Sequence, residues 1–320
     1  MKAIEVFDNR LKIVETTMPS LQEAEVLIKV KSAGVNRADI AQKNGLYPPP
    51  AGASQILGLE CSGVIESIGE GVTTRKIGEE VCALLSGGGY AEFVACPEKQ
   101  VLLKPSNLNW DEAASLPEIY ATCWLNLFME GNLQPGEKVV FHAGASGIGT
   151  AGIQLCKNFG CESFVTAGTK EKIDFCIDLG ASEGAIRPDD IFQKIGSWAP
   201  DGVNLILDPV GASYFNDNLK VLGMDGRIII IGLMGGIKTD INLGQLMMKR
   251  HKIIGSTIRA RSLAVKESVI DQLNRKVWPL IENHSIIPVI HQVFDWENAN
   301  QAHEVMELNS NTGKLILKIS

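Results

Sequence analysis

The stretch FHAGASGIGTAGIQL, Phe141–Leu155, decides the fold class of this chain. It follows the apolar run Lys138–Val140, which predicts a strand, and it leads into a segment whose pattern predicts a helix. Glycine-rich turns between a strand and a helix usually bind phosphate, because backbone N–H groups converge there and the helix dipole favours an anion. The stretch therefore predicts a phosphate-binding loop near the middle of the chain.

The loop follows the dinucleotide template G-x-G-x-x-G with one departure. Gly144 can make the tight turn, and Gly149 allows close packing of helix on strand. Ser146 stands where the template has the glycine that permits the closest backbone approach to pyrophosphate. The N–H groups of Gly147 and Ile148 still open the helix, so we predict that the loop binds a dinucleotide.

The middle of the chain alternates strands and helices. The predicted strands are 138–142, 163–167, 203–208, 227–231 and 253–258, and the predicted helices are 148–159, 170–179, 214–222 and 243–249. Such alternation is typical of βαβ units and predicts an α/β fold with a doubly wound parallel sheet.

The two ends of the chain have a different pattern. Short β signals with glycine-bearing turns fill the first third, and mixed helix and strand signals return after Ile258. We therefore expect a dinucleotide-binding domain at 122–260, inserted between the two parts of an α+β domain at 1–121 and 261–320.

Composition narrows the class of protein. The chain has 320 residues with a formal net charge of −7, which disfavours nucleic acid or anionic membrane as a partner. It has no run of about 18 apolar residues, and Met1–Val6 predicts a strand rather than a signal peptide. We expect a cytoplasmic enzyme.

Cysteine and histidine usage predicts no metal site. The seven cysteines include no C-x-x-C pair, and the five histidines are dispersed without a cysteine partner at ligand spacing. Most cysteines lie in apolar runs, so we interpret them as small core residues.

The end of the second predicted strand indicates which dinucleotide binds. NAD-specific sites usually have Asp or Glu there to bond the ribose 2′-hydroxyl, and this chain has none. Gly168 and Thr169 are followed by a lysine pair that includes Lys172, and Arg187 at the tip of the next unit adds positive charge. These residues favour a 2′-phosphate, so we predict NADP(H).

Two further glycine turns follow strands of the same predicted sheet. One begins at Asp208 and has the sequence DPVG, and the other, GLMGG, begins with Gly232, Leu233 and Met234. Together they predict an extended ligand that crosses the sheet at its switch point, with Gly232–Met234 near the nicotinamide.

Four motifs resemble one family, the quinone oxidoreductase (zeta-crystallin-like) branch of the medium-chain dehydrogenase/reductase superfamily. They are NRADI (36–40), LGLECSGVIESIG (57–69), HAGASGIGTAGIQL (142–155) and NLILDPVG (204–211), in family order along the chain. The resemblance implies a GroES-like twisted β catalytic domain, completed by the C-terminal segment, into which a Rossmann domain is inserted. It also implies NADPH, a homodimer formed by edge strands, and reduction of quinones, ortho-quinones in particular.

The resemblance assigns roles to residues of this chain. It implies that 146–149 with Gly168, Thr169 and Lys172 hold the pyrophosphate and the adenosine phosphate. It implies that Thr122 and 232–234 flank the nicotinamide, and that Asn311 and Lys314 close over the cofactor.

The chain departs from family patterns at two places. Many relatives have Tyr beside the adenosine phosphate, where this chain has Ile186 next to Arg187. The catalytic zinc ligands of alcohol dehydrogenases align with Asn36, Leu59-Glu60 and Ile119, which offer no thiolate or imidazole. We therefore predict chemistry without zinc.

Two residues are candidates for the reacting centre. Asn36 would orient the nicotinamide ribose or the substrate carbonyl, or else cap the helix of NRADI. Tyr47 would stack on a planar substrate or donate its hydroxyl, or else pack its loop. Glu60 is interpreted as a structural partner, with Arg37 as a candidate counter-ion.

A quinone is a strong electrophile, so positioning supplies most of the catalysis and no acid is needed. An NADPH-binding protein with little turnover and an enoyl-thioester reductase remain as alternatives. The small-molecule acceptor is predicted to be a quinone or an enone, with no nucleic-acid or membrane partner.

Overall fold

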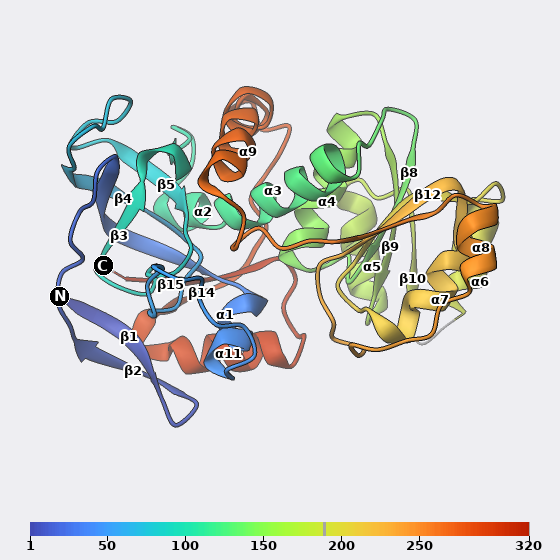
Figure 1. Ribbon diagram of the computed structural model, residues 1–320, viewed down its shortest axis with the longest axis horizontal. Helices are drawn as coiled ribbons and strands as arrows, with labels where there is room; N and C mark the ends of the chain where they lie inside the picture. Colours follow the sequence, from blue (N-terminus) through green and yellow to red (C-terminus); the bar gives the residue numbers. More distant parts are fainter. Residues whose placement is uncertain (188–189, 320) are drawn as a thin grey trace. The chain divides into compact units, whose positions relative to one another are not determined.

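The computed structural model describes residues 1–187 and 190–319 and has two compact units (Figure 1). The first unit joins Met1–Ala121 to Ile258–Ser320, and the second is Thr122–Thr257. The first unit thus resumes at Ile258, slightly before the boundary expected at residue 261.

The second unit is built on a six-stranded parallel sheet in the order β10-β9-β8-β11-β12-β13. Its strands are β8 Lys138–His142, β9 Glu162–Ala167, β10 Glu183–Ile186, β11 Val203–Asp208, β12 Leu222–Ile230 and β13 Lys252–Gly255. Chain order reverses between β8 and β11, which makes the doubly wound topology with its switch point at the carboxyl ends of these two strands. The predicted parallel sheet is confirmed.

Helices connect these strands. They are α4 Gly147–Asn158, α5 Lys170–Leu179, α6 Ile191–Trp198, α7 Ala212–Val221 and α8 Leu243–Met248. Between sheet and helices lies a core that includes Val140, Phe164, Ile206 and Ile228, all fully buried. Such apolar strands form because a parallel sheet is covered on both faces.

The first unit contains a seven-stranded sheet in the order β14-β15-β3-β4-β5-β7, with β6 also paired to β3, and a separate hairpin β1-β2. The strands are β1 Lys2–Phe7, β2 Arg10–Glu15, β3 Glu25–Val35, β4 Glu60–Ile68, β5 Glu80–Leu84, β6 Phe93–Pro97, β7 Val101–Leu103, β14 Ile290–Asp295 and β15 Lys314–Lys318. Because β15 pairs antiparallel with β3, the C-terminal segment completes the N-terminal sheet as expected.

The helices of the first unit are short apart from α9. They are α1 Arg37–Lys43, α2 Trp110–Ala114, α9 Leu263–Lys276, α10 Trp278–Glu282 and α11 Ala299–Glu307, with 3-10 turns at Glu98–Gln100 and Trp296–Asn298. Helix α3 Pro117–Trp124 crosses the boundary between the units and continues as a π-helical turn, Leu125–Glu130.

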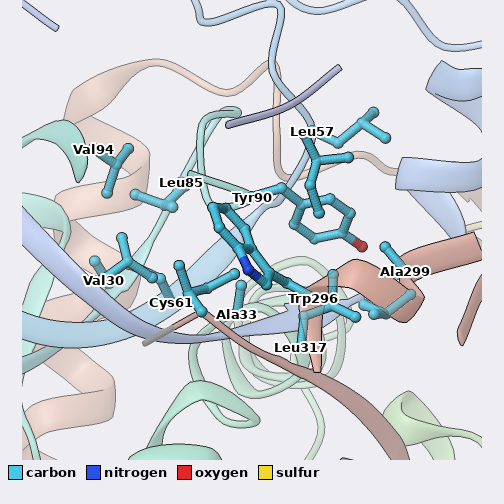
Figure 2. Close-up of a cluster of buried hydrophobic side chains, with 14 of the residues drawn as sticks. Val30, Ala33, Leu57, Cys61, Leu85, Tyr90, Val94, Trp296, Ala299 and Leu317 are labelled. Atoms are coloured by element: carbon cyan, nitrogen blue, oxygen red, sulfur yellow. The ribbon is translucent and has the colours of Figure 1, made fainter. Parts of the chain in front are cut away.

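The core of the first unit mixes residues from both ends of the chain. Figure 2 shows Val30, Cys61 and Tyr90 from the N-terminal part packed with Trp296 and Leu317 from the C-terminal part. Each of these side chains is buried, so neither part has this core without the other.

All seven cysteines are free and buried, as expected of small core residues, and burial raises the pKa of the Cys156 thiol well above its usual value. Among residues 1–187 and 190–319, no three or more His, Cys, Asp or Glu side chains are grouped to hold a metal ion. No helix of the described chain is both long and apolar enough to span a membrane.

Candidate cofactor and active site

The turn after β8 differs in detail from the template. The residue in the left-handed conformation is Ala143, with φ 57°. Gly144 is required not for its backbone conformation but because a side chain there would meet β9. A Cβ on Gly144 would lie 2.5 Å from the Val165 side chain on β9. A Cβ on Gly149 would lie 2.2 Å from the Gly144 carbonyl oxygen, so this second glycine lets the helix start against the turn.

Ser146 is the N-cap of α4. Its Oγ accepts a hydrogen bond from the N–H of Gly149 at 3.1 Å. The first N–H groups of a helix have no intrahelical acceptor, so those of Gly147 and Ile148 remain to bind an anion. The serine therefore replaces the template glycine without closing the anion site.

Thr122 lies one residue from a contact with this loop. The thiol of Cys123 on α3 donates to the carbonyl oxygen of Ile148 at 3.2 Å. Thr122 itself is buried, and its carbonyl accepts from the Asn126 side chain at 2.8 Å.

Two cations lie together at the end of β9. Burial and the neighbouring Arg187 guanidinium lower the pKa of Lys172. Arg187 Nη2 lies 3.9 Å from the Cβ position of Gly168, and Arg187 Nε is buried with no hydrogen-bond partner among the described residues. Thr169 caps α5 by accepting from the Lys172 N–H at 3.3 Å. The two cations, Lys172 and Arg187, and the N–H of Arg187 Nε fit a 2′-phosphate.

Lys170, the other lysine of this segment, is engaged elsewhere. It forms an exposed (i, i+4) ion pair with Asp174 at 2.6 Å. Of the lysine pair in the sequence, only Lys172 is near Arg187.

Asp208 shapes its own turn. It is fully buried, and its carboxylate accepts from the N–H groups of Val210 at 2.6 Å and Gly211 at 3.2 Å and from Asn218 Nδ2 at 3.2 Å. Burial raises its pKa despite these bonds. All of the contacts that the structure gives Asp208 lie within the protein, which indicates that it acts through the turn.

The second glycine turn is bonded to the first. The N–H of Met234 donates to the carbonyl oxygen of Pro209 at 3.2 Å, and a Cβ on Gly232 would lie 2.7 Å from the same oxygen. Leu233 and Met234 are about half exposed. The loops after β8, β9, β11 and β12 thus share one edge of the parallel sheet, the edge where doubly wound sheets bind extended ligands, and binding of the dinucleotide by these loops stays a prediction.

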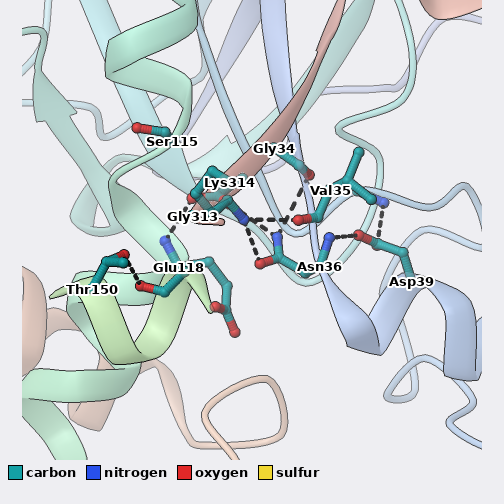
Figure 3. Close-up of polar contacts among 12 residues, drawn as sticks. Gly34, Val35, Asn36, Asp39, Ser115, Glu118, Thr150, Gly313 and Lys314 are labelled. Carbon is teal, nitrogen blue, oxygen red and sulfur yellow. Dashed lines mark hydrogen bonds and ion pairs between the residues drawn. The ribbon is translucent and has the colours of Figure 1, made fainter. Parts of the chain in front are cut away.

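A second polar cluster lies in the first unit, where the end of β3 meets the starts of β4 and β15 (Figure 3). Lys314 Nζ donates to Val35 O at 2.8 Å, to Asn36 Oδ1 at 2.6 Å and to Glu60 Oε1 at 2.6 Å. These three acceptors use all three protons of a buried ammonium. Lys314 was expected to close over the cofactor, but its charge is directed into the protein.

Glu60 is satisfied at both oxygens. Its Oε1 also accepts from Asn36 Nδ2 at 2.9 Å, and its Oε2 accepts from the Glu118 N–H at 2.9 Å. Arg37, the candidate partner from the sequence, bonds the Met306 carbonyl at 2.6 Å instead. The counter-ion of Glu60 is therefore Lys314.

Asn36 is the N-cap of α1, where its backbone N–H donates to Asp39 Oδ2 at 2.8 Å in a capping box. Its second amide proton has only a long contact, 3.5 Å to Gly34 O, so one donor can be redirected to a ligand. Asn311, also expected near the cofactor, donates to Gly313 O at 2.7 Å within its own turn.

The residues at the alcohol dehydrogenase zinc positions do not fit a zinc ion. The Lys314 ammonium occupies one oxygen of Glu60, Asn36 supplies a neutral amide, and Ile119 is apolar and 5% exposed. Zinc prefers thiolate, imidazole or free carboxylate, and a cation already neutralises this carboxylate.

Tyr47 lies half-buried in the loop 44–59, between α1 and β4. The guanidinium of Arg259 lies 5.4 Å from the centroid of its ring. Sequence patterns missed Arg259, because its partner is 212 positions away in the chain. They also missed Gly34, where a Cβ would lie 2.2 Å from Glu60 Oε1.

Two family models match the chain. Residues 22–106 match the alcohol dehydrogenase GroES-like domain, and residues 147–275 match the zinc-binding dehydrogenase model. Together they cover parts of both units.

Similar proteins agree with these matches. The rat quinone oxidoreductase is 31% identical over 99% of this chain and 97% of its own length. The zebrafish synaptic vesicle membrane protein VAT-1 homolog is 29% identical over 95% of this chain, which spans only 66% of that protein.

Solved structures agree over the full chain. A mycobacterial protein solved with NADPH has a TM-score of 0.89 at 25% identity, with all of both chains covered. The enoyl reductase CurK has a TM-score of 0.85 at 26% identity, over 100% of this chain and 99% of CurK. This chain therefore belongs to the quinone oxidoreductase family of the medium-chain dehydrogenase/reductase superfamily.

Proposed function

We propose that the protein is an NADPH-dependent, zinc-independent reductase that transfers hydride to quinones, with ortho-quinones preferred, or to related enones. The observation that carries the proposal is the pair Lys172 and Arg187 at the end of β9, where no carboxylate follows the strand. A dianionic 2′-phosphate would supply the partner that Arg187 Nε lacks among residues 1–187 and 190–319. The similarity to rat quinone oxidoreductase supports the acceptor class.

In this proposal the second unit holds the cofactor. The N–H groups of Gly147 and Ile148 bind the pyrophosphate, and Arg187 and Lys172 bind the 2′-phosphate. Thr122 and the loop Gly232–Met234 flank the nicotinamide.

We propose that Asn36 and Tyr47 contact the substrate. The reduced nicotinamide supplies the hydride, and a quinone accepts it without a Lewis acid. The amide proton of Asn36 that makes the long contact to Gly34 O would turn to hold the substrate carbonyl oxygen or the nicotinamide ribose, and Tyr47 would stack on the planar acceptor. Water supplies the proton that completes the reduction.

Steady-state oxidation of NADPH and NADH, with an ortho-quinone, a para-quinone and an enone in parallel and EDTA present, tests the proposal. We expect EDTA-resistant turnover with NADPH that is fastest with the ortho-quinone. Tight NADPH binding without turnover of any acceptor would contradict it and favour a binding protein.

An enoyl-thioester reductase is a second candidate, because CurK has the same fold over the whole chain. An enoyl-thioester in the same assay separates the two. A kcat/KM for the thioester above that for every quinone would favour this alternative.

We also propose a cytoplasmic homodimer in which β13 strands pair edge to edge. β13 ends the sheet, and exposed apolar side chains lie in it and in the segment before it along the chain: Ile237, Leu243, Met247, Met248 and Ile253. Light scattering should give a dimer mass, and Ile253→Lys should shift it toward the monomer. Seven free thiols suit a reducing compartment.

A further inference from the structure

Arg259 is a buried cation at the point where the chain re-enters the first unit. That unit resumes at Ile258, and Arg259 is only 3% exposed. Neither the dinucleotide site nor the Lys314 cluster uses it.

The guanidinium joins three segments of the first unit. Its Nε donates to the Ser86 carbonyl at 2.9 Å, its Nη2 to Gln42 Oε1 at 2.7 Å and its Nη1 to the Tyr47 carbonyl at 3.4 Å. The same group lies 5.4 Å from the Tyr47 ring centroid. Arg259 therefore connects the last turn of α1, the loop after it and the turn after β5.

Every acceptor that this guanidinium has among the described residues is neutral. No ion pair among the described residues includes Arg259, and burial lowers its pKa, with only Asp39 and Tyr47 acting in the opposite direction. Burying a charge without a paired carboxylate costs free energy unless hydrogen bonds compensate it. The rigid guanidinium donors therefore need these oxygens in fixed positions.

In the part of the loop around Tyr47, residues 44–52, no residue is buried. Gly45 and Gly52 have φ 72° and 82°, and a Cβ at either would meet nothing within 4 Å. Leu46 is 80% exposed. The loop therefore depends on anchors outside itself.

We propose that Arg259 is a positioning residue that fixes the main chain and the ring of Tyr47, and so sets how the acceptor is bound. This inference rests on the proposed function, in which Tyr47 contacts the substrate. Arg259 acts through Tyr47 and does not touch the reacting atoms.

Amide hydrogen exchange across residues 42–56 tests the anchor without any turnover. Arg259→Met should raise exchange there by roughly tenfold, with core strands β3 and β15 unchanged. Arg259→Lys keeps the charge but loses the planar set of guanidinium donors, so we expect a smaller rise in exchange across residues 42–56. Arg275→Gln, which removes an exposed guanidinium from α9, should leave exchange in the loop unchanged.

Kinetics test the consequence. Arg259→Met should raise the quinone KM by about tenfold while the NADPH Kd stays as in the wild type. In a Tyr47→Ala background the same substitution should have no further effect on KM, because Arg259 acts through that ring.

Unchanged exchange in residues 42–56 would overturn the anchor. The positioning role would be overturned if Arg259→Met raised exchange but left the quinone KM unchanged. It would also be overturned if Arg259→Met raised the quinone KM as much in the Tyr47→Ala background as in the wild type. Should Arg259→Met fail to fold, Arg259→Lys gives the same comparison. A wild type that reduces no acceptor contradicts the proposed function, whereas the exchange result still decides the anchor.

Discussion

Lys314 is a buried cation whose partners all lie within the protein. Its ammonium lies 2.6 Å from a Glu60 carboxylate that is fully buried, and Gly34 leaves the space for this approach. The same ammonium orients Asn36 through the amide oxygen. A buried ion pair of this kind adds little net stability, but it fixes the geometry of its partners.

Removing only the cation should be strongly destabilising. Lys314→Met leaves Glu60 as an unpaired buried charge, so we expect unfolding free energy to fall by about 3–5 kcal/mol in urea denaturation. Adding Glu60→Gln to that variant should recover much of the loss. Equal stability of single and double variants would contradict the ion-pair account.

Arg187 should determine cofactor choice. In the proposed site Arg187→Gln would remove charge-assisted bonds to the 2′-phosphate, so we expect the NADPH Kd to rise roughly 10- to 100-fold, with little change for NADH. Fluorescence titration of the reduced cofactors measures both. Lys170→Gln is the matched control, because that lysine pairs with Asp174 on the surface. Equal losses for both cofactors would remove Arg187 from the 2′-phosphate site.

At the scale of elements, the start of α4 explains the departure from the dinucleotide template. Ser146 caps the helix, whereas a glycine would offer no side-chain acceptor for the Gly149 N–H. The pattern 141–155 predicted strand, turn and helix correctly, since periodicity and glycine placement are local. The strand and helix patterns of the middle of the chain missed two elements, β10, which has only four residues, and α6.

The cap should contribute to stability. Ser146→Ala should lower the free energy of unfolding by about 1 kcal/mol and Ser146→Gly by only a few tenths, because glycine is a tolerable N-cap. Thermal denaturation of the two variants measures the difference. A larger loss for Ser146→Gly than for Ser146→Ala would be incompatible with a capping role.

At the scale of the whole molecule, buried neutral histidines make stability depend on pH. His142 Nε2 donates to Asn218 Oδ1 at 2.7 Å, its Nδ1 accepts from Thr166 Oγ1 at 3.2 Å, and burial lowers its pKa from 6.5 to about 4. Burial likewise lowers the pKa of His303, to about 3. Asp39 opposes them, since burial raises its pKa to about 6.

The sign for His142 follows from its depressed pKa. Below pH 6.5 the unfolded chain takes up a proton that the folded protein refuses, so stability is lost as the pH falls from 6.5 toward 4. Between pH 7 and 5 this residue should cost about 2 kcal/mol. His142→Gln should flatten the pH profile by that amount in urea titrations. Parallel profiles for the two proteins would contradict the assignment.

The sequence by itself determined the βαβ series, the glycine loops at strand ends and the missing acid after β9, because these depend on residues close together in the chain. Only the tertiary structure decided the partners of Lys314 and Arg259. Lys314 bonds Asn36 across 278 positions, and Arg259 bonds Tyr47 across 212. No local pattern encodes such pairs, since strand pairing and the return of the chain after the inserted unit bring them together.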